Sequence, residues 1–525
     1  MSEQPSVAAG QVDLEPEHCT DLGNARRLVR MFGQDMRYVP ARGEWRVWTG
    51  THWARDETGH VERFAKAVAE ELYREAGFEL DERRRRELAK HAMQSESVRA
   101  IRGMVTLAQS ERGIAEAPSA FDRDLWLLNV ANGTIELRTQ GLLDAAKLRE
   151  HRRGDLITKL IPVAYDPSAT CETFLAFLKR IFSDRQQLIE YVQRAIGYSL
   201  TGLTTEQILW LCWGVGANGK TTLMQAIARL LSGYSASLAA ETLLARKGDT
   251  ALAMNDLAEV QGARFVVAVE SDMGRRLAEA LVKAVTGGES VKVKRLYADV
   301  YAITPTFKLW IGTNHKPVIR GTDHAIWRRI HLVPFETIIP EAEQDHQLLD
   351  KLEAERPGIL AWAVAGCLAW QRGGLGTPEE VRRATAAYRS EMDALGDFLA
   401  DRCILDAQAA VTAGELHDAY SDWSKRAGEA QLSKRALHLQ LTERGFVARR
   451  TKNERTWVGL RLRGLLDGDA SPVVTLGDAV SDNFLLRARE SGSSQNKRHQ
   501  ASSVTDASPE PWAESDMFDP PGTEL

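Results

Sequence analysis

A short glycine-rich segment between an apolar run and a helical run constrains the fold of this chain more than any other feature. The apolar run 208–213 leads into GVGANGKT, which starts at Gly214 and ends at Thr221, and apolar residues at helical spacing follow. The backbone amides of such a turn can surround a polyphosphate, and the start of the helix adds partial positive charge. Lys220 can reach the β- and γ-phosphates, and the Thr221 hydroxyl can hold Mg²⁺. The pattern therefore predicts an α/β nucleotide-binding core.

A second apolar run supplies the carboxylate that a hydrolytic nucleotide site needs for its metal ion and attacking water. Residues 265–269 are apolar, Glu270 ends the run, and Asp272 follows two positions later. We predict that Glu270 binds Mg²⁺ together with Thr221 and activates water, and that Asp272 contributes to the site. The spacing leaves the division of labour between the two carboxylates open. The predicted nucleotide-binding residues are Gly214, Val215, Gly216, Ala217, Asn218, Gly219, Lys220, Thr221 and Thr222.

Two later segments place polar residues beside predicted strands. Asn314 ends the apolar run that starts at Phe307, and its amide can orient an attacking water, although Thr-Asn before a proline also fits a simple turn. Arg328 and Arg329 precede another apolar run. One of them can supply, from a neighbouring subunit, the cation that stabilises a transferred phosphoryl group, and a surface charge pair is the alternative.

Basic residues cluster locally in two predicted hairpins. Lys292 and Lys294 alternate with apolar residues, so one strand face presents their charge, either to solvent or to a sugar-phosphate backbone. Near the C-terminal end, segment 445–463 has the pattern of two strands joined by a basic turn, and either a solvated hairpin or a phosphate-contacting wing fits it. The net charge of the whole chain does not reveal these basic clusters, because 67 Lys plus Arg are balanced by 72 Asp plus Glu, which gives a net charge of −5.

Length and composition set broad limits on the protein class. The 525 residues suffice for roughly three or four domains. The five cysteines form no CxxC pair, which predicts a reducing compartment and no structural zinc. The N-terminus lacks a secretory pattern, and the apolar run Ile359 to Trp370 is too short to span a bilayer. We therefore expect a cytoplasmic protein without a membrane partner.

Taken in order, the motifs resemble those of superfamily 3 helicases, in particular the phage/plasmid primase-helicase family and its relatives in large DNA viruses. The matching segments are NVANGTIEL, YVQRAIGYSLTG, GVGANGKTT, VVAVESD, LVKAVTGGESVKVKRLY, KLWIGTNHKP and GTDHAIWRRIHLVPF. The resemblance covers roughly residues 21–463. It implies an α/β fold: an AAA+-like P-loop ATPase core with an α+β N-terminal helicase-associated domain and a C-terminal winged-helix domain.

The resemblance implies an ATP-driven, Mg²⁺-dependent DNA helicase of a phage or mobile element. Such a protein assembles as a hexameric ring, moves 3′-to-5′ on single-stranded DNA and separates forked duplexes. In ring ATPases the sensing Asn, here Asn314, lies between the phosphate-loop strand and the acidic strand. One departure from the pattern is Ser271, which separates Glu270 from Asp272 where two adjacent carboxylates are common.

The resemblance also assigns DNA contacts. It places Lys292, Lys294 and Arg295 on a hairpin that faces the central channel. It makes 433–443 a recognition-type helix, and the wing residues near phosphates are Arg449, Arg450, Lys452 and Arg455.

The predicted domains are a leader at 1–19, the N-terminal helicase-associated domain at 20–200, the ATPase with a helical extension at 201–393, the winged helix at 394–463 and a disordered tail at 464–525. Primase activity is not expected in this chain, since few residues precede the helicase-associated region and a structural turn explains Asp122 and Asp124. A separately encoded primase and other replication proteins are candidate partners, and the bacterial host cytoplasm is the expected location. Two alternatives stay open: an AAA+ initiator or loader without processive unwinding, and a non-hydrolysing DNA-binding protein.

Overall fold

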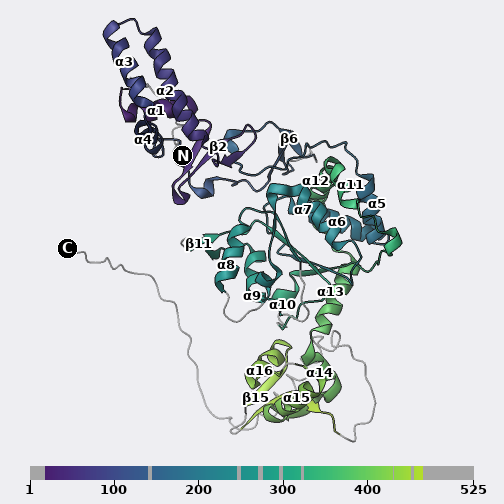
Figure 1. Ribbon diagram of the computed structural model, residues 1–525. Coiled ribbons are helices and arrows are strands. Elements are labelled where there is room, and N and C mark those ends of the chain that lie inside the picture. The colour runs from purple at the N-terminus through teal and green to yellow at the C-terminus, as the bar shows by residue number, and fades with distance from the viewer. Residues whose placement is uncertain are drawn as a thin grey trace, which may run out of the picture. The chain divides into compact units, whose positions relative to one another are not determined.

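The computed structural model describes residues 18–139, 145–244, 250–269, 276–294, 300–320, 324–429, 431–450 and 454–464. The chain divides into two compact units, Met1–Asp393 and Ala394–Leu525. Figure 1 shows a helical N-terminal part, a parallel sheet flanked by helices, and a small C-terminal unit. No helix in these described ranges is long and apolar enough to cross a membrane.

The N-terminal part of the first unit combines a helical cluster with two small antiparallel sheets, ordered β1-β2-β3 and β4-β5-β6. Helix α1 starts at Asp21 because the Thr20 hydroxyl accepts a hydrogen bond from the backbone N–H of Gly23. A small core joins this helix to α2 and α4. The elements are α1 (Asp21–Phe32), β1 (Met36–Val39), β2 (Glu44–Trp48), β3 (Trp53–Arg55), α2 (His60–Phe78), α3 (Glu82–Ser95), α4 (Val98–Ala108), β4 (Leu127–Val130), β5 (Gly133–Glu136) and β6 (Lys147–Arg149).

The carboxylates of Asp122 and Asp124 are both engaged in local contacts. Asp122 accepts hydrogen bonds from the backbone N–H and the hydroxyl of Thr158. Asp124 accepts from the backbone N–H of Trp126 at 3.0 Å and from Arg138 at 3.2 Å. These contacts stabilise the turn before β4, so both carboxylates have a structural role there.

A five-stranded, fully parallel sheet forms the centre of the first unit, with the strand order β13-β7-β12-β9-β8. A separate two-stranded antiparallel sheet pairs β10 with β11. The elements are α5 (Glu172–Ile181), α6 (Gln186–Ser199), β7 (Leu209–Trp213), α7 (Lys220–Leu231), β8 (Ser235–Ser237), α8 (Thr250–Glu259), β9 (Phe265–Val269), α9 (Glu279–Gly287), β10 (Val291–Lys294), β11 (Val300–Ile303), β12 (Lys308–Thr313), α10 (His324–Trp327), β13 (Ile330–Pro334), α11 (Leu348–Ala354), α12 (Arg356–Gly373) and α13 (Glu379–Glu391).

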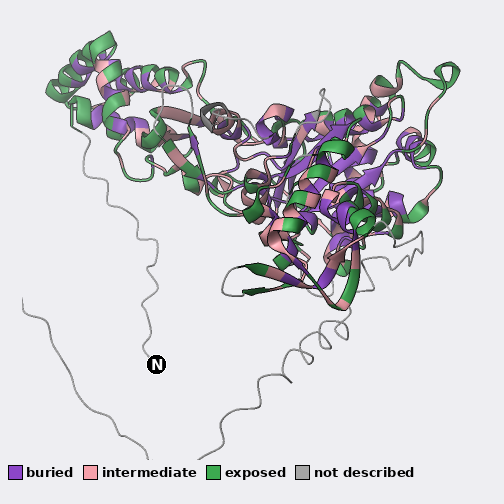
Figure 2. Ribbon diagram, turned by 90° about the horizontal axis from the view of Figure 1, so that it is seen from below, coloured by how far each residue is buried: buried purple, intermediate pink, exposed green. Residues whose placement is uncertain are grey.

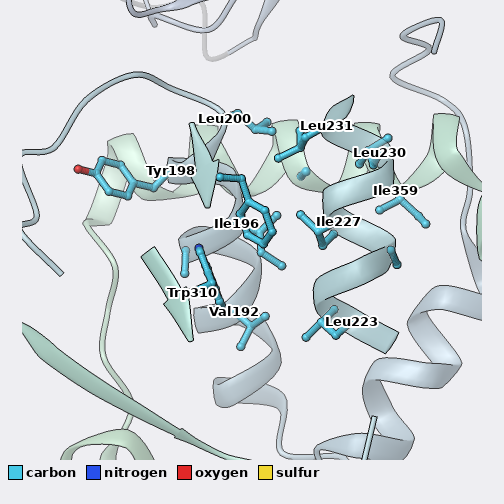
Figure 3. Packing of buried hydrophobic residues seen from close by; sticks show 14 of the residues in the cluster. Val192, Ile196, Tyr198, Leu200, Leu223, Ile227, Leu230, Leu231, Trp310 and Ile359 are labelled. Carbon is cyan, nitrogen blue, oxygen red and sulfur yellow. The ribbon is translucent and has the colours of Figure 1, made fainter. Parts of the chain in front are cut away.

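Both faces of this sheet are buried, which explains why its strands are apolar at successive positions. Trp210 and Trp310 stack with ring centroids 4.9 Å apart on the face covered by α6, α7 and α12. Leu209 and Leu309 point to the opposite cluster, which includes residues of α8, α9 and α13. Buried residues gather on the strands and on the helix faces against them (Figure 2). Figure 3 shows side chains of α6, α7 and β12 converging on the first cluster.

Two buried cations tie the sheet to the segments before it. The guanidinium of Arg264 donates to the carbonyl oxygens of Leu200 and Leu127, at 2.5 and 2.8 Å. Lys308 donates to the carbonyl oxygens of Thr201 and Leu203. Burial lowers the pKa of Arg264 and holds that of Lys308 well below its usual range. Buried carbonyl oxygens need hydrogen-bond donors inside the protein. The two cations therefore hold the segments that carry these carbonyl groups in place before the sheet.

In its described residues, the second unit has a three-stranded antiparallel sheet with the order β14-β16-β15 and three helices around its own core. Helix α15 starts in a capping box, in which Thr412 and Glu415 each bond the other's backbone N–H. Its elements are α14 (Ala394–Arg402), β14 (Cys403–Thr412), α15 (Ala413–Ala427), α16 (Lys434–Glu443), β15 (Val447–Arg450) and β16 (Arg455–Leu462). The structure thus shows a mixed α/β protein with a parallel central sheet, and the winged-helix assignment stays a prediction.

Candidate nucleotide-binding site

The loop between β7 and α7 has the backbone conformation of a tight, glycine-dependent turn. Gly216, Ala217 and Gly219 have φ values of 109°, 45° and 80°. Only glycine adopts such values without cost, so Ala217 carries local strain. Helix α7 begins at Lys220 without a side-chain cap on its first turn. The backbone N–H of Lys220 donates to the side-chain oxygen of Asn218 at 3.5 Å, and the N-cap residue Gly219 has no side chain that could cap the other amides of this turn.

Two glycines of this loop are required by close neighbours. A Cβ on Gly214 would lie 2.2 Å from the carbonyl oxygen of Phe335, at the end of β13. A Cβ on Gly219 would lie 2.5 Å from Ile181 at the end of α5. The backbone N–H of Ile339 also donates to the Ala217 carbonyl at 2.8 Å. The loop is thus held between α5 and the segment after β13.

Lys220 lies at the centre of the site and is almost fully buried, with 6% of its surface exposed. Its ammonium group donates to the Gly214 carbonyl at 2.6 Å and to the side-chain oxygens of Asn218 and Asn314, both at 3.0 Å. Burial lowers the pKa of Lys220, and the Cys212 thiol partly offsets this shift. All three acceptors are neutral, so the described contacts of Lys220 leave room for an anionic partner.

Asn218 gives the loop a second anchor. Its side-chain nitrogen donates to the Phe335 carbonyl at 3.1 Å, while its oxygen accepts from Lys220. The sequence pattern includes Asn218 in the loop but gives no sign of this bridging role.

Asn314 reaches Lys220 because β12 lies between β7 and β9. Thr313, the last residue of β12, pairs with Trp213 of β7 on one side. Gly312 pairs with Val269, the last residue of β9, on the other side. The carboxyl ends of the three strands therefore meet at one edge of the sheet. Glu270 and Asp272, the predicted metal and water-activating residues, lie outside the described residues.

Lys316 is a neighbour of the site that sequence reasoning missed. Its ammonium lies 4.5 Å from the centre of the Trp213 ring and 2.7 Å from each carboxylate oxygen of Glu391 in α13. The segment after Asn314 is thus tied both to the phosphate-loop strand and to α13. The sequence feature that could have indicated Lys316 is its position two residues after Asn314.

The paired arginines differ in accessibility. Arg329 is 8% exposed, and its guanidinium donates to the Ala325 carbonyl at 2.6 Å and to Gln207. Arg328 is exposed and donates to Gln207 at 2.7 Å. A role toward a neighbouring subunit requires an accessible guanidinium, which favours Arg328 over Arg329.

The predicted DNA-contacting residues occupy exposed strand positions where they are described. On β10, Lys292 and Lys294 are exposed while Val293 between them is fully buried. In the second unit, Arg449 and Arg450 end β15 and Arg455 starts β16, and all three are exposed. Arg295 and Lys452 lie outside the described residues.

The residues of the loop fit a nucleoside triphosphate. The loop offers the amides at the start of α7 and a buried ammonium whose described partners are neutral, and Thr221 is exposed in the first turn of α7. Within the described ranges, no group of three or more His, Cys, Asp or Glu side chains is placed to hold a metal ion.

Two known families match consecutive parts of the chain. A family described as "D5 N terminal like" matches residues 25–183. A family of unknown function, DUF5906, matches residues 212–329, which include the phosphate loop and Asn314.

Curated relatives come from large DNA viruses. A protein named "Putative helicase" of Acanthamoeba polyphaga mimivirus is 23% identical over 328 residues, which cover 58% of this chain and 33% of the relative. A "Putative helicase" of Frog virus 3 is 26% identical over 269 residues, covering 48% and 27%. A "Putative primase" of African swine fever virus is 22% identical over 331 residues, covering 58% and 34%. The chain spans about a third of the length of these relatives.

A solved structure, the apo form of the NrS-1 C terminal region, aligns with 82% of this chain and 98% of its own, with a TM-score of 0.46 and 9% identity. Parts of the chain are thus similar to the D5 N terminal like family and to viral proteins that are named putative helicases.

Proposed function

We propose that this chain is an ATP-dependent DNA helicase of a phage or mobile element, with its motor in residues 201–393. The observation that carries the proposal is the contact between Lys220 and Asn314, which joins the phosphate loop to the neighbouring parallel strand. The strand order, with β12 between β7 and β9, is the order that the AAA+-like resemblance implies. The helicase names of the viral relatives support the same activity.

The side chains around the loop divide the work of ATP hydrolysis. Bound ATP with Mg²⁺ supplies the phosphoanhydride bond whose hydrolysis drives movement. Lys220 positions the β- and γ-phosphates, and the Thr221 hydroxyl, with Glu270, holds the metal. An ammonium group only donates, so the Asn314 oxygen must face Lys220, and its NH₂ group is left to hold and orient water. Glu270 or Asp272 accepts the proton of that water.

Contacts with neighbours and DNA are assigned to residues outside this loop. Arg328 is the residue that we propose acts on the nucleotide of an adjacent subunit in a hexameric ring. The exposed Lys292 and Lys294 grip the backbone of the translocating strand, and the wing arginines of the second unit contact flanking phosphates. Movement in the 3′-to-5′ direction follows from the family resemblance.

Steady-state ATP turnover tests the site directly. Lys220→Ala removes the only described ammonium in the loop, so we expect turnover to fall by about 10²-fold or more, with and without DNA. Arg229→Ala is the matched control, since Arg229 lies on the same helix but pairs on the surface with Glu353 at 3.2 Å. The control should retain turnover. Normal turnover in Lys220→Ala would show that the loop is not the hydrolytic site.

A further inference from the structure

The four residues from Asn314 to Pro317, here called the Asn314 segment, are held at both ends. The segment starts directly after β12, and Thr313 at the end of that strand pairs with Trp213 of β7. At the other end, the Pro317 carbonyl accepts a hydrogen bond from the buried hydroxyl of Tyr388 in α13. Asn314 thus lies between an anchor on the central sheet and an anchor on a helix.

Lys316 gives the Asn314 segment a further contact with α13. Its ammonium lies 2.7 Å from each carboxylate oxygen of Glu391, and only 14% of the Lys316 side chain is exposed. The same ammonium lies over the rings of Trp213 and Tyr388, 4.5 and 5.7 Å from their centres. A carboxylate and two aromatic faces therefore act together to fix the position of this ammonium.

These surroundings distinguish Lys316 from an ordinary surface cation. Exposed ion pairs contribute little, because both side chains lose freedom and water screens their charges. Elsewhere on α13, Arg383 forms such a pair with Glu379, and 79% of its side chain is exposed. Lys316 instead joins two elements that are far apart in the sequence, and it is shielded by aromatic rings. Its contacts hold the Asn314 segment against α13.

The position of Lys316 affects that of Asn314, because a single residue separates them. Neighbouring Cα atoms are about 3.8 Å apart, so a shift of one residue is passed largely to the other. The Thr313 hydroxyl also fixes the turn, since it accepts a hydrogen bond from the backbone N–H of His315 at 3.0 Å. Because Lys220 reaches the Asn314 oxygen at 3.0 Å, a small displacement would weaken that hydrogen bond.

Helix α13 is itself fixed to the central sheet and to the helix before the arginine pair. The backbone N–H of Leu332 in β13 donates to the Thr385 hydroxyl at 3.0 Å. The ring of Tyr388 packs edge-on against Trp327, with ring centres 5.2 Å apart. Trp327 directly precedes Arg328. The helix that holds the Asn314 segment therefore also contacts the element that carries the arginine pair.

We propose that Lys316 is a positioning residue for ATP hydrolysis: its ion pair with Glu391 holds Asn314 in reach of the phosphate loop. This role rests on the proposed function, because it presupposes hydrolysis at that loop. Lys316 acts through the backbone of its segment and does not contact the nucleotide. Its loss therefore slows the chemical step and leaves nucleotide binding in place.

ATP turnover by the full chain, together with titration of a non-hydrolysable ATP analogue and Mg²⁺, tests the proposal. Lys316→Met keeps the length of the side chain and removes its charge. We expect kcat to fall about tenfold while the dissociation constant of the analogue changes by less than about twofold. Lys316→Arg keeps the ion pair and should keep kcat within about threefold of the original value. The matched control is Arg383→Met, which removes one charge and one ion pair from α13 away from the Asn314 segment and should leave kcat unchanged.

A double-mutant cycle shows whether Lys316 acts through Glu391. Glu391→Ala should lower kcat about as much as Lys316→Met, because either change removes the same ion pair. The double variant should be no slower than Lys316→Met alone, since the contact can be lost only once. Full activity of Glu391→Ala, or losses that multiply in the double variant, would overturn the proposal.

Two further measurements separate positioning from other roles. If Lys316→Met weakened binding of the analogue by about tenfold or more, Lys316 would be a ligand of the nucleotide and the proposal would be wrong. Glu391 has 51% of its side chain exposed, so Glu391→Ala should keep the thermal midpoint of the original chain. A lower midpoint that accompanies the loss of kcat would assign the ion pair to folding instead.

Failure of this proposal is distinguishable from failure of the proposed function. If only the role of Lys316 is wrong, Lys220→Ala still stops ATP turnover while Lys316→Met and Glu391→Ala turn over ATP at the original rate. If the original chain has no ATP turnover, or if Lys220→Ala retains it, the hydrolytic site itself is wrong and the role of Lys316 falls with it.

Discussion

At the scale of single residues, the hydrogen bond between Lys220 and Asn314 connects the loop after β7 to the segment that directly follows β12. The described acceptors of the Lys220 ammonium are neutral oxygens, and among them the Asn314 amide comes from outside the loop, directly after β12. Asn314 itself is exposed, and its side-chain oxygen is the atom that accepts the hydrogen bond from Lys220. A neutral amide keeps the lysine charge available for phosphate, which a carboxylate would not.

Substitutions of Asn314 should separate these two effects. Asn314→Ala removes the water-orienting NH₂ group, so kcat for ATP should fall by about 10²-fold while nucleotide affinity changes little. Asn314→Asp places a carboxylate on Lys220, and this ion pair competes with phosphate, so nucleotide affinity should fall instead. Affinity from nucleotide titration, together with kcat from turnover, checks both variants. If both variants lost kcat and nucleotide affinity to the same extent, the result would contradict the separate roles assigned to the oxygen and the NH₂ group of Asn314.

At the scale of elements, the β10–β11 hairpin presents charge on one strand face and anchors the other. Val293 is fully buried, and Ile303 of β11 is 5% exposed in the same cluster, while Lys292 and Lys294 stay exposed. The apolar face fixes the hairpin on the core, so the lysines can be changed without loss of its packing. This separation makes the hairpin suitable for a direct test.

Replacing both lysines, by Lys292→Ala with Lys294→Ala, should leave ATP turnover without DNA within about twofold and remove its stimulation by single-stranded DNA. The reason is that, under the proposed function, the lysines contact the strand and not the nucleotide. Replacing both by arginine keeps the charge and should retain most of the stimulation. Turnover measured over a series of DNA concentrations checks both pairs. Full stimulation in the alanine variant would contradict the channel-facing role.

Sequence patterns located the local elements of the site better than the contacts between them. The glycine spacing identified the loop at Gly214–Gly219, because a tight turn needs residues that tolerate positive φ. The charged side chains of Arg264 and Lys308 carry no such local signal. Both are buried and bonded to carbonyl groups far away in sequence, and their partners become visible only in the folded chain. The same holds for Arg450 and Arg455, whose pairing across the β15–β16 hairpin depends on strand register.

At the scale of the whole molecule, the two compact units divide the proposed tasks. The first unit contains the parallel sheet, the loop around Lys220 and the β10–β11 hairpin. The second unit has its own core, in which Leu416, Tyr420 and Trp457 are buried. Under the proposed function, the first unit is the motor.

Strand displacement on a forked DNA duplex, with ATP turnover followed in the same reaction, tests the central claim most directly. The chain should release the displaced strand only with ATP and Mg²⁺, and a duplex with a 3′ single-stranded tail should be opened in preference to one with a 5′ tail. Lys220→Ala should do neither, and Arg229→Ala should do both. ATP turnover without displacement of either substrate would indicate an initiator or loader instead, and displacement by Lys220→Ala would contradict the account outright.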